Sequence, residues 1–113
     1  MGIQGQRAAP VSPLQRSLEL LREQGYVVDI VERRLPRCAV TKDLFGIADL
    51  LCLRGEEIVA VQCTSRSHVS HRQRKIAEAE TLPAIRKAGI RVLIHGWGKM
   101  AGGRWECRVV DCS

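Results

Sequence analysis

Two short apolar runs joined by a polar, glycine-containing turn constrain the fold of this chain most strongly. Residues 47–53 (IADLLCL) and 58–64 (IVAVQCT) have the length and composition of buried strands, and residues 54–57 (RGEE) separate them. Strands joined by so short a turn lie side by side and run antiparallel. The sequence therefore predicts a β-hairpin, and with it a sheet.

A helix and a further strand are expected before this hairpin. Ser12 suits the N-cap of a helix and Pro13 its first position, a stripe of leucines at helical spacing follows, and Gly25 ends the pattern. Residues 26–32 (YVVDIVE) alternate enough to predict a strand, which a basic loop through Pro36 follows.

The second half of the chain predicts a crossover helix between strands. The helix expected over residues 70–88 starts with a capping box, Ser70 and Gln73, and Pro83 kinks or splits it. Strands are expected at 90–95 (IRVLIH) and 104–110 (RWECRVV). The predicted order is α-β-β-β-α-β-β, an α/β fold in which helices flank a mixed central sheet, with the second helix leading to a parallel strand.

Size and composition predict one small intracellular domain. A chain of 113 residues with 45% hydrophobic residues has room for one core. We expect a flexible N-terminal arm over residues 1–11, a single domain over residues 12–113, and a homodimer to support its modest stability. Five cysteines without a Cys-x-x-Cys pair argue against a zinc site or a disulfide framework and favour a reducing, cytoplasmic location. The sequence contains no long apolar stretch, so we expect no membrane partner.

Clustered positive charge is the functional signal in the composition. Eighteen Lys and Arg residues against twelve Asp and Glu residues give a net charge of +6, which favours a polyanionic partner. The alternative is that the charge serves solubility alone. The predicted nucleic-acid-binding residues are Arg33, Arg34, Arg37, Arg66, His68, His71, Arg72, Arg74 and Lys75.

Three polar residues interrupt the apolar runs of the hairpin. Asp49 opens the first run, while Gln62 and Thr64 close the second and project from the same face of their strand. Burying such groups without partners costs several kcal/mol, so they are expected to share a task at one edge of the sheet. The alternative is structural: Asp49 caps the strand or pairs with Arg54 or Lys42, and the other two occupy an edge.

The same residues resemble the core of the PD-(D/E)XK nuclease superfamily. In that core an Asp opens one strand and an acidic-x-Lys triplet closes the next, as residues 46–53 (GIADLLCL) and 57–65 (EIVAVQCTS) do in outline. The helix ending in Gly25-Tyr26 and the basic helix after the hairpin resemble the archaeal Holliday-junction resolvase branch. The similarity covers roughly residues 14–97.

Asp49, Gln62 and Thr64 take the family's catalytic positions in this resemblance. It makes Asp49 the metal-binding aspartate, Gln62 the second acidic position and Thr64 the lysine. Gln62 can still offer a carbonyl oxygen to Mg²⁺. Thr64 cannot replace an ammonium group, so catalysis requires a cation from elsewhere.

Basic residues of the following helix are the candidates to supply that cation. Lys75 comes first, then His71 and Arg72; the alternative for Lys75 is a contact to phosphate or an ordinary surface position. Asp43 is a candidate second carboxylate for the ion, or a turn residue. The family also has a glutamate in its first helix, and neither Glu19 nor Glu23 falls at the position of that glutamate.

Three functions follow from this sequence. The first is a metal-dependent endonuclease that hydrolyses DNA phosphodiester bonds with Mg²⁺ or Mn²⁺, with branched DNA as one candidate substrate. The second is a nuclease-fold module that binds DNA or RNA without catalysis, and the third is a protein-interaction or dimerisation subunit. Trp97 and Trp105 either stack on an unpaired base or belong to the core or an interface.

Overall fold

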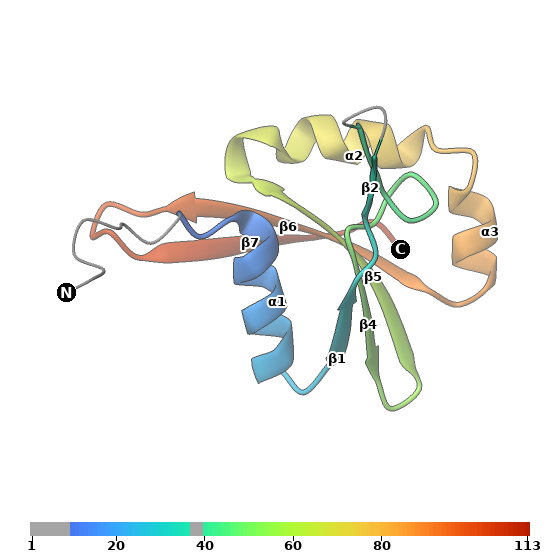
Figure 1. Ribbon diagram of the computed structural model, residues 1–113, viewed down its shortest axis with the longest axis horizontal. Helices are drawn as coiled ribbons and strands as arrows, with labels where there is room; N and C mark the ends of the chain where they lie inside the picture. Colours follow the sequence, from blue (N-terminus) through green and yellow to red (C-terminus); the bar gives the residue numbers. More distant parts are fainter. Residues whose placement is uncertain (1–9, 37–39) are drawn as a thin grey trace.

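The computed structural model describes residues 10–36 and 40–113 of the chain. Its elements follow one another as a helix, a set of strands, two short helices and a final strand pair (Figure 1). They are α1 (Pro13–Glu23), β1 (Val27–Ile30), β2 (Arg33–Leu35), β3 (Val40–Lys42), β4 (Leu50–Arg54), β5 (Glu57–Ser65), the 3₁₀ turn η1 (Arg66–His68), α2 (Val69–Ala77), α3 (Leu82–Lys87), β6 (Arg91–Lys99) and β7 (Trp105–Asp111).

A five-stranded mixed sheet forms the centre of the molecule. Its strand order is β1-β4-β5-β6-β7, and only β5 and β6 run parallel. β4 and β5 form the predicted hairpin, and the helical segment between β5 and β6 is the predicted crossover. The expectation of an α/β fold with helices flanking a mixed sheet is confirmed.

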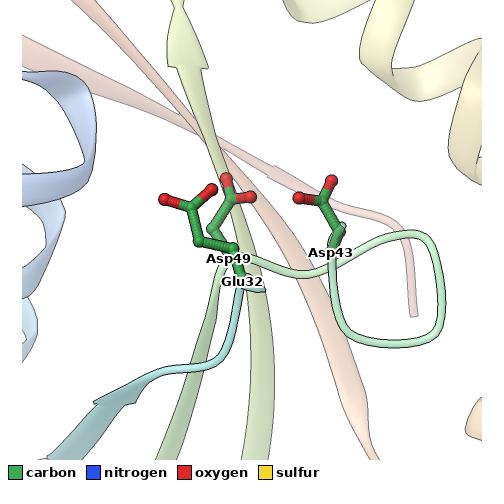
Figure 2. Close-up of side chains that lie close together, drawn as sticks. All are labelled: Glu32, Asp43 and Asp49. Atoms are coloured by element: carbon green, nitrogen blue, oxygen red, sulfur yellow. The ribbon is translucent and has the colours of Figure 1, made fainter. Parts of the chain in front are cut away.

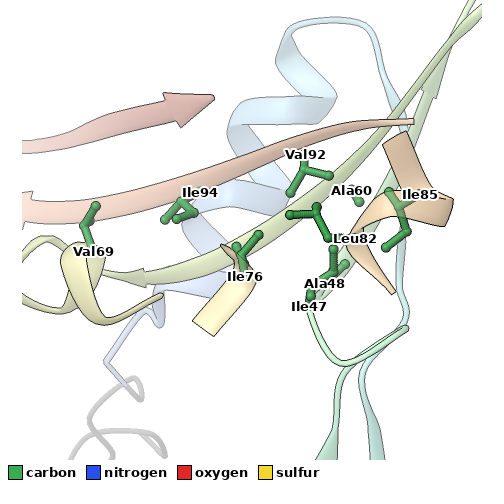
Figure 3. Close-up of a cluster of buried hydrophobic side chains, with 9 residues drawn as sticks. All are labelled: Ile47, Ala48, Ala60, Val69, Ile76, Leu82, Ile85, Val92 and Ile94. Atoms are coloured by element: carbon green, nitrogen blue, oxygen red, sulfur yellow. The ribbon is translucent and has the colours of Figure 1, made fainter. Parts of the chain in front are cut away.

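Each face of the sheet carries its own hydrophobic cluster, and the two clusters hold different helices. On one face Leu21 of α1 packs with Tyr26 and with apolar residues of β4, β5 and β6. On the other face α2 and α3 cover the sheet (Figure 3). The second cluster comprises Ile47, Ala48, Ala60, Val69, Ile76, Leu82, Ile85, Val92 and Ile94.

A buried polar network also holds α1 on the sheet. Ser17, fully buried, lies 2.9 Å from His95 Nδ1 through its Oγ, and the same oxygen accepts a hydrogen bond from Trp97 Nε1 over 2.8 Å. Burial lowers the pKa of His95 to about 4, so the imidazole is neutral near pH 7. Trp97 is therefore a half-buried structural residue on β6.

The start of α1 follows its sequence signals. Ser12 Oγ accepts a hydrogen bond from the Gln15 backbone nitrogen at 3.2 Å, and the Gln15 side chain accepts one from the Ser12 nitrogen at 3.4 Å. With Pro13 at the first position, the helix has both the cap and the fixed backbone angle expected of it.

The predicted helix over residues 70–88 is wrong at its start. α2 begins at Val69 without a side-chain cap, so Ser70 and Gln73 form no capping box. Val69 is fully buried against Gly96, where even a Cβ would lie 2.3 Å from its Cγ2, and this packing sets the helix start. The predicted split of the segment is confirmed: α2 ends at Ala77 and α3 begins at Leu82, with Pro83 in the first turn of α3, where its missing N–H is tolerated.

The basic loop predicted after β1 is also more ordered than expected. Residues 33–35 pair antiparallel with residues 40–42 as a separate two-stranded sheet, β2 and β3. Arg37 and Cys38 lie outside the described residues, as do residues 1–9 of the predicted arm. Within the described parts of the chain, no helix is long and apolar enough to cross a membrane.

Candidate active site

Three carboxylates meet at one end of the central hairpin. Glu32 lies between β1 and β2, Asp43 directly follows β3, and Asp49 directly precedes β4. One oxygen of each lies within 4.8 Å of the others, and Figure 2 shows the three side chains pointing to the same side. Residues from three separate segments thus form one acidic cluster.

Two backbone pairings bring these segments together. β1 and β4 pair so that Ile30 faces Leu50, and the Val31 nitrogen donates to the Asp49 carbonyl over 2.8 Å, which places Glu32 beside Asp49. The Leu44 nitrogen donates to the Ala48 carbonyl, also over 2.8 Å, and closes the turn that returns the chain from Asp43 to Asp49.

Asp49 is the most tightly held of the three acids. It is 6% exposed, and its Oδ2 accepts hydrogen bonds from Gln62 Nε2 and from the Cys63 backbone nitrogen, each over 2.8 Å. Its own nitrogen donates to the Val61 carbonyl across the hairpin. The carboxylate is therefore fixed to β5 on one side and open toward the cluster on the other.

Ionisation of Asp49 and Glu32 is unfavourable in this cluster. Burial is the main cause that raises the pKa of Asp49 to about 7; the hydrogen bond from the Cys63 nitrogen opposes this increase, and nearby Asp43 and Glu32 add to it. Burial and Asp43 also raise the pKa of Glu32. Among the described residues, no ion pair involves any of the three carboxylates.

Of the structural alternatives predicted for Asp49, the ion pairs with Arg54 or Lys42 are wrong, whereas its side chain does accept a backbone N–H at the strand end, from Cys63. Arg54 pairs with Glu57 at 3.0 Å and donates to the Gln24 carbonyl, so it is engaged at the other end of the hairpin. Lys42 is exposed and makes no ion pair in the described part of the chain. Asp49 thus has neither of its expected cationic partners.

Gln62 presents two different atoms to its surroundings. Nε2 donates to Asp49, while Oε1 is buried without a hydrogen-bond partner in the described structure. An unsatisfied buried acceptor costs about 1–3 kcal/mol. The amide therefore orients Asp49 through Nε2, and its carbonyl oxygen is left without a hydrogen bond.

The acids line a cavity of about 370 Å³ that opens between α1 and α2. Residues 12–14 at the start of α1 form one wall, and Arg72 and Lys75 of α2 contribute to another. Arg72 Nε is buried without a hydrogen-bond partner, whereas Lys75 is exposed. The cavity thus combines an acidic floor with a basic wall, a pairing suited to a metal ion and a phosphate.

The other predicted catalytic and binding residues are more dispersed. Thr64 is 6% exposed and pairs with Gly96 in the sheet, and it does not line the cavity. Arg66 lies over Gly98 and donates to the Met100 sulfur, and His68 Nδ1 lies 2.6 Å from Ser65 Oγ.

Four further basic residues lie outside the cavity. His71 and Arg74 are exposed on α2, and Arg74 lines a separate depression on the molecule. Arg33 and Arg34 are exposed on β2.

Glu32 is the site residue that the sequence prediction missed. Its only local signal is an acidic residue closing an alternating strand and followed by two arginines. Glu19 and Glu23 of α1 lie instead beside Trp97 and Trp105, where Arg16 stacks on the Trp105 ring at 4.0 Å. The third carboxylate therefore comes from the segment after β1.

Comparisons of the chain with protein-family models, with curated proteins and with solved structures gave no significant match.

Proposed function

We propose that this chain is a metal-dependent endonuclease that hydrolyses DNA phosphodiester bonds, with the acidic cluster holding Mg²⁺ or Mn²⁺. The observation that carries the proposal is the convergence of Glu32, Asp43 and Asp49 within 4.8 Å, in a cavity that Arg72 and Lys75 also line. The resemblance of residues 46–65 to the PD-(D/E)XK core supports the same reading, as does the predicted order of helices and strands.

The residues present fit a hard divalent cation. A cation bound among the three carboxylates stabilises them, because burial and neighbouring acids raise the pKa of Asp49 and Glu32 and no ion pair neutralises the cluster in the described chain. Gln62 lines the same cavity, and its unpartnered Oε1 is a neutral oxygen of the kind that Mg²⁺ accepts. When bound, the ion supplies Lewis acidity toward the scissile phosphate and the attacking water.

The chain's own residues orient the acids and bind the phosphate. Gln62 and the Cys63 nitrogen fix the Asp49 carboxylate, so its free oxygen faces the cluster without reorganisation. Arg72 and Lys75 offer positive charge to the non-bridging phosphate oxygens. In this proposal Lys75 supplies the positive charge of the family's lysine, whose position Thr64 takes in this chain.

The proposal extends to a homodimer that acts on branched DNA. Three exposed apolar residues, Val27, Leu53 and Ile58, face one another across β1, β4 and β5 and are 73%, 46% and 37% exposed. A contiguous apolar row of this kind favours association. Sedimentation of wild type against Leu53→Lys tests the dimer independently of cleavage.

A cleavage assay tests the activity. Single-stranded, duplex and four-way-junction DNA are incubated with Mg²⁺ or Mn²⁺ and wild type, Asp49→Asn or Glu32→Gln, with Asp29→Asn as the matched control because Asp29 is an exposed acid on β1. We expect cleavage by wild type and the control and loss of about 10²-fold or more in both site variants. Salt-sensitive binding without cleavage in any sample indicates the binding module instead.

A further inference from the structure

A second cavity adjoins the acidic cluster. It measures about 540 Å³, and Asp43 lines both cavities. Ile30, Leu44 and Phe45 give it an apolar wall. A ligand bound at the acids therefore has an apolar compartment beside it.

Phe45, which lines this cavity, has a backbone conformation that costs energy. Among the described residues, Phe45 is the one non-glycine residue with a positive φ, 55°. This backbone conformation costs a residue with a side chain about 1–2 kcal/mol. The turn is held in place by Thr81, whose Oγ1 donates to the Phe45 carbonyl over 2.7 Å. Glycine would allow the same turn without strain.

The two hydrophobic clusters of the core do not account for the aromatic ring of Phe45, which also lines a smaller apolar hollow of about 200 Å³ beside α3. The residue is 55% exposed and lies outside both hydrophobic clusters. A strained, exposed aromatic residue beside a candidate active site indicates a contact with a ligand.

Two cations complete the second cavity. Arg33 and Lys42 are Cα partners across β2 and β3, both are exposed, and both line the cavity with Phe45. An apolar wall with an aromatic ring and two adjacent cations complements a ligand with a planar ring and an anionic group. A nucleotide has both features.

We propose that this cavity is a nucleobase subsite of the nuclease. Resting on the proposed function, it holds the base of a nucleotide whose neighbouring phosphate lies at the acidic cluster. Phe45 stacks on the base, and Arg33 and Lys42 contact a phosphate of the same strand. A base in a continuous duplex is stacked and paired, so the subsite selects DNA with unpaired bases: single strands, flaps, loops or junction centres.

Equilibrium binding separates this subsite from general attraction to DNA. Affinities for single-stranded and duplex oligonucleotides of equal length are measured at fixed salt without divalent metal, for wild type, Phe45→Ala, Phe45→Trp and the control Val109→Ala, which removes an exposed apolar side chain on β7. We expect Phe45→Ala to weaken single-strand binding by about ten-fold or more and leave duplex binding unchanged, while Phe45→Trp and the control retain wild-type affinity. Equal losses on both DNAs, or no loss, overturn the subsite.

Phe45→Gly tests whether a loss of DNA affinity results from a destabilised fold. Because glycine removes the ring and the strain together, its midpoint of thermal unfolding is expected at or above that of wild type, with the single-strand affinity lost. A lowered midpoint shows that the ring is structural and overturns the proposal.

The two proposals fail in different ways. If wild type binds single strands through Phe45 but cleaves no DNA, the nuclease proposal fails and the subsite stands. If wild type cleaves through Asp49 without dependence on Phe45, only the subsite fails. Failure to bind either DNA overturns both.

Discussion

Gln62 donates its side-chain Nε2 to Asp49 Oδ2 over 2.8 Å and leaves its own Oε1 buried and unpartnered. The amide thus fixes the buried carboxylate, and its own oxygen is left without a hydrogen bond in the described structure. This pairing holds the Asp49 carboxylate in a fixed position in the protein without a ligand. Its consequences can be measured in the protein without DNA.

Binding of a divalent ion is expected to stabilise the fold. Mg²⁺ or Mn²⁺ should raise the thermal unfolding midpoint of wild type, because a ligand at one hundred times its dissociation constant stabilises a protein by about 2.7 kcal/mol. Asp49→Asn should lose most of this increase, and Asp29→Asn, which alters an exposed acid on β1, should retain it. Equal responses of the two variants would place the ion elsewhere.

Gln62→Glu is expected to exchange stability for metal affinity. A fourth carboxylate against Asp49 replaces a hydrogen bond by repulsion, so the metal-free variant should lose about 1–3 kcal/mol in chemical denaturation at pH 8. The same charge should tighten binding of Mn²⁺ measured by titration calorimetry. The isosteric Gln62→Met, which offers neither group, should weaken metal binding; a variant that binds as tightly as wild type contradicts a role for the Gln62 oxygen.

The sequence could predict the elements whose signals are local. The capped start of α1, the β4–β5 hairpin and a crossover to a parallel strand all follow from patterns within a few residues of each element. β2 was missed because Arg33–Leu35 has neither alternation nor β-branched residues, and its pairing with β3 lies outside the main sheet.

The site could be predicted only in part for a similar reason. Asp49 and Gln62 stand out because they interrupt apolar runs of one hairpin. Glu32 joins them only through the register of β1 against β4, and the distance between Asp43 and Asp49 depends on the turn at Phe45. Neither relationship can be deduced from the spacing of residues along the chain.

Without metal, the free energy of unfolding is expected to fall as the pH rises and Asp49 ionises. Its folded pKa of about 7 lies above its ordinary 3.8, so the folded state binds the extra proton and this stabilisation, at most about 4 kcal/mol, is present below pH 4 and lost by pH 7. Asp49→Asn, which keeps an acceptor for Gln62 and Cys63, should remove this slope in denaturation measured between pH 5 and pH 8 in EDTA.

His95 is expected to act in the opposite direction. Its folded pKa of about 4 lies below its ordinary 6.5, so its contribution to stability is lost as the pH falls from 6.5 toward 4. His95→Gln should reduce the loss of stability between pH 6.5 and pH 4. If the change of stability between pH 5 and pH 8 beyond this loss is the same in His95→Gln as in wild type, that change is assigned to the acidic cluster.

Lys75 and Arg74 are expected to differ although they are neighbours on α2. Lys75 lines the cavity of the acidic cluster, whereas Arg74 lines a separate depression. Lys75→Ala should therefore lower the cleavage rate by about 10²-fold at saturating DNA, the scale expected when a group that stabilises transition-state charge is lost. Arg74→Ala should change at most the affinity and its salt dependence. Equal losses in the two variants would show that charge on α2 acts only through DNA attraction.

Gly96 on β6 controls where α2 begins, and through it the basic wall of the cavity. A Cβ at this position would lie 2.3 Å from Val69 Cγ2 and 3.4 Å from the Arg66 backbone, so Gly96→Ala must displace the first residue of α2. We expect a loss of about 1–3 kcal/mol in chemical denaturation, as overpacked cores show. Gly102→Ala, whose added Cβ meets no atom within 4 Å and whose φ is not positive, is the control.

The same substitution, Gly96→Ala, should also affect cleavage, because Arg72 and Lys75 follow Val69 on the displaced helix α2. Cleavage should fall in the fraction that remains folded, while metal binding at the three carboxylates persists. A variant that loses metal binding in proportion to cleavage would show that the helix supports the acids themselves and not only the phosphate.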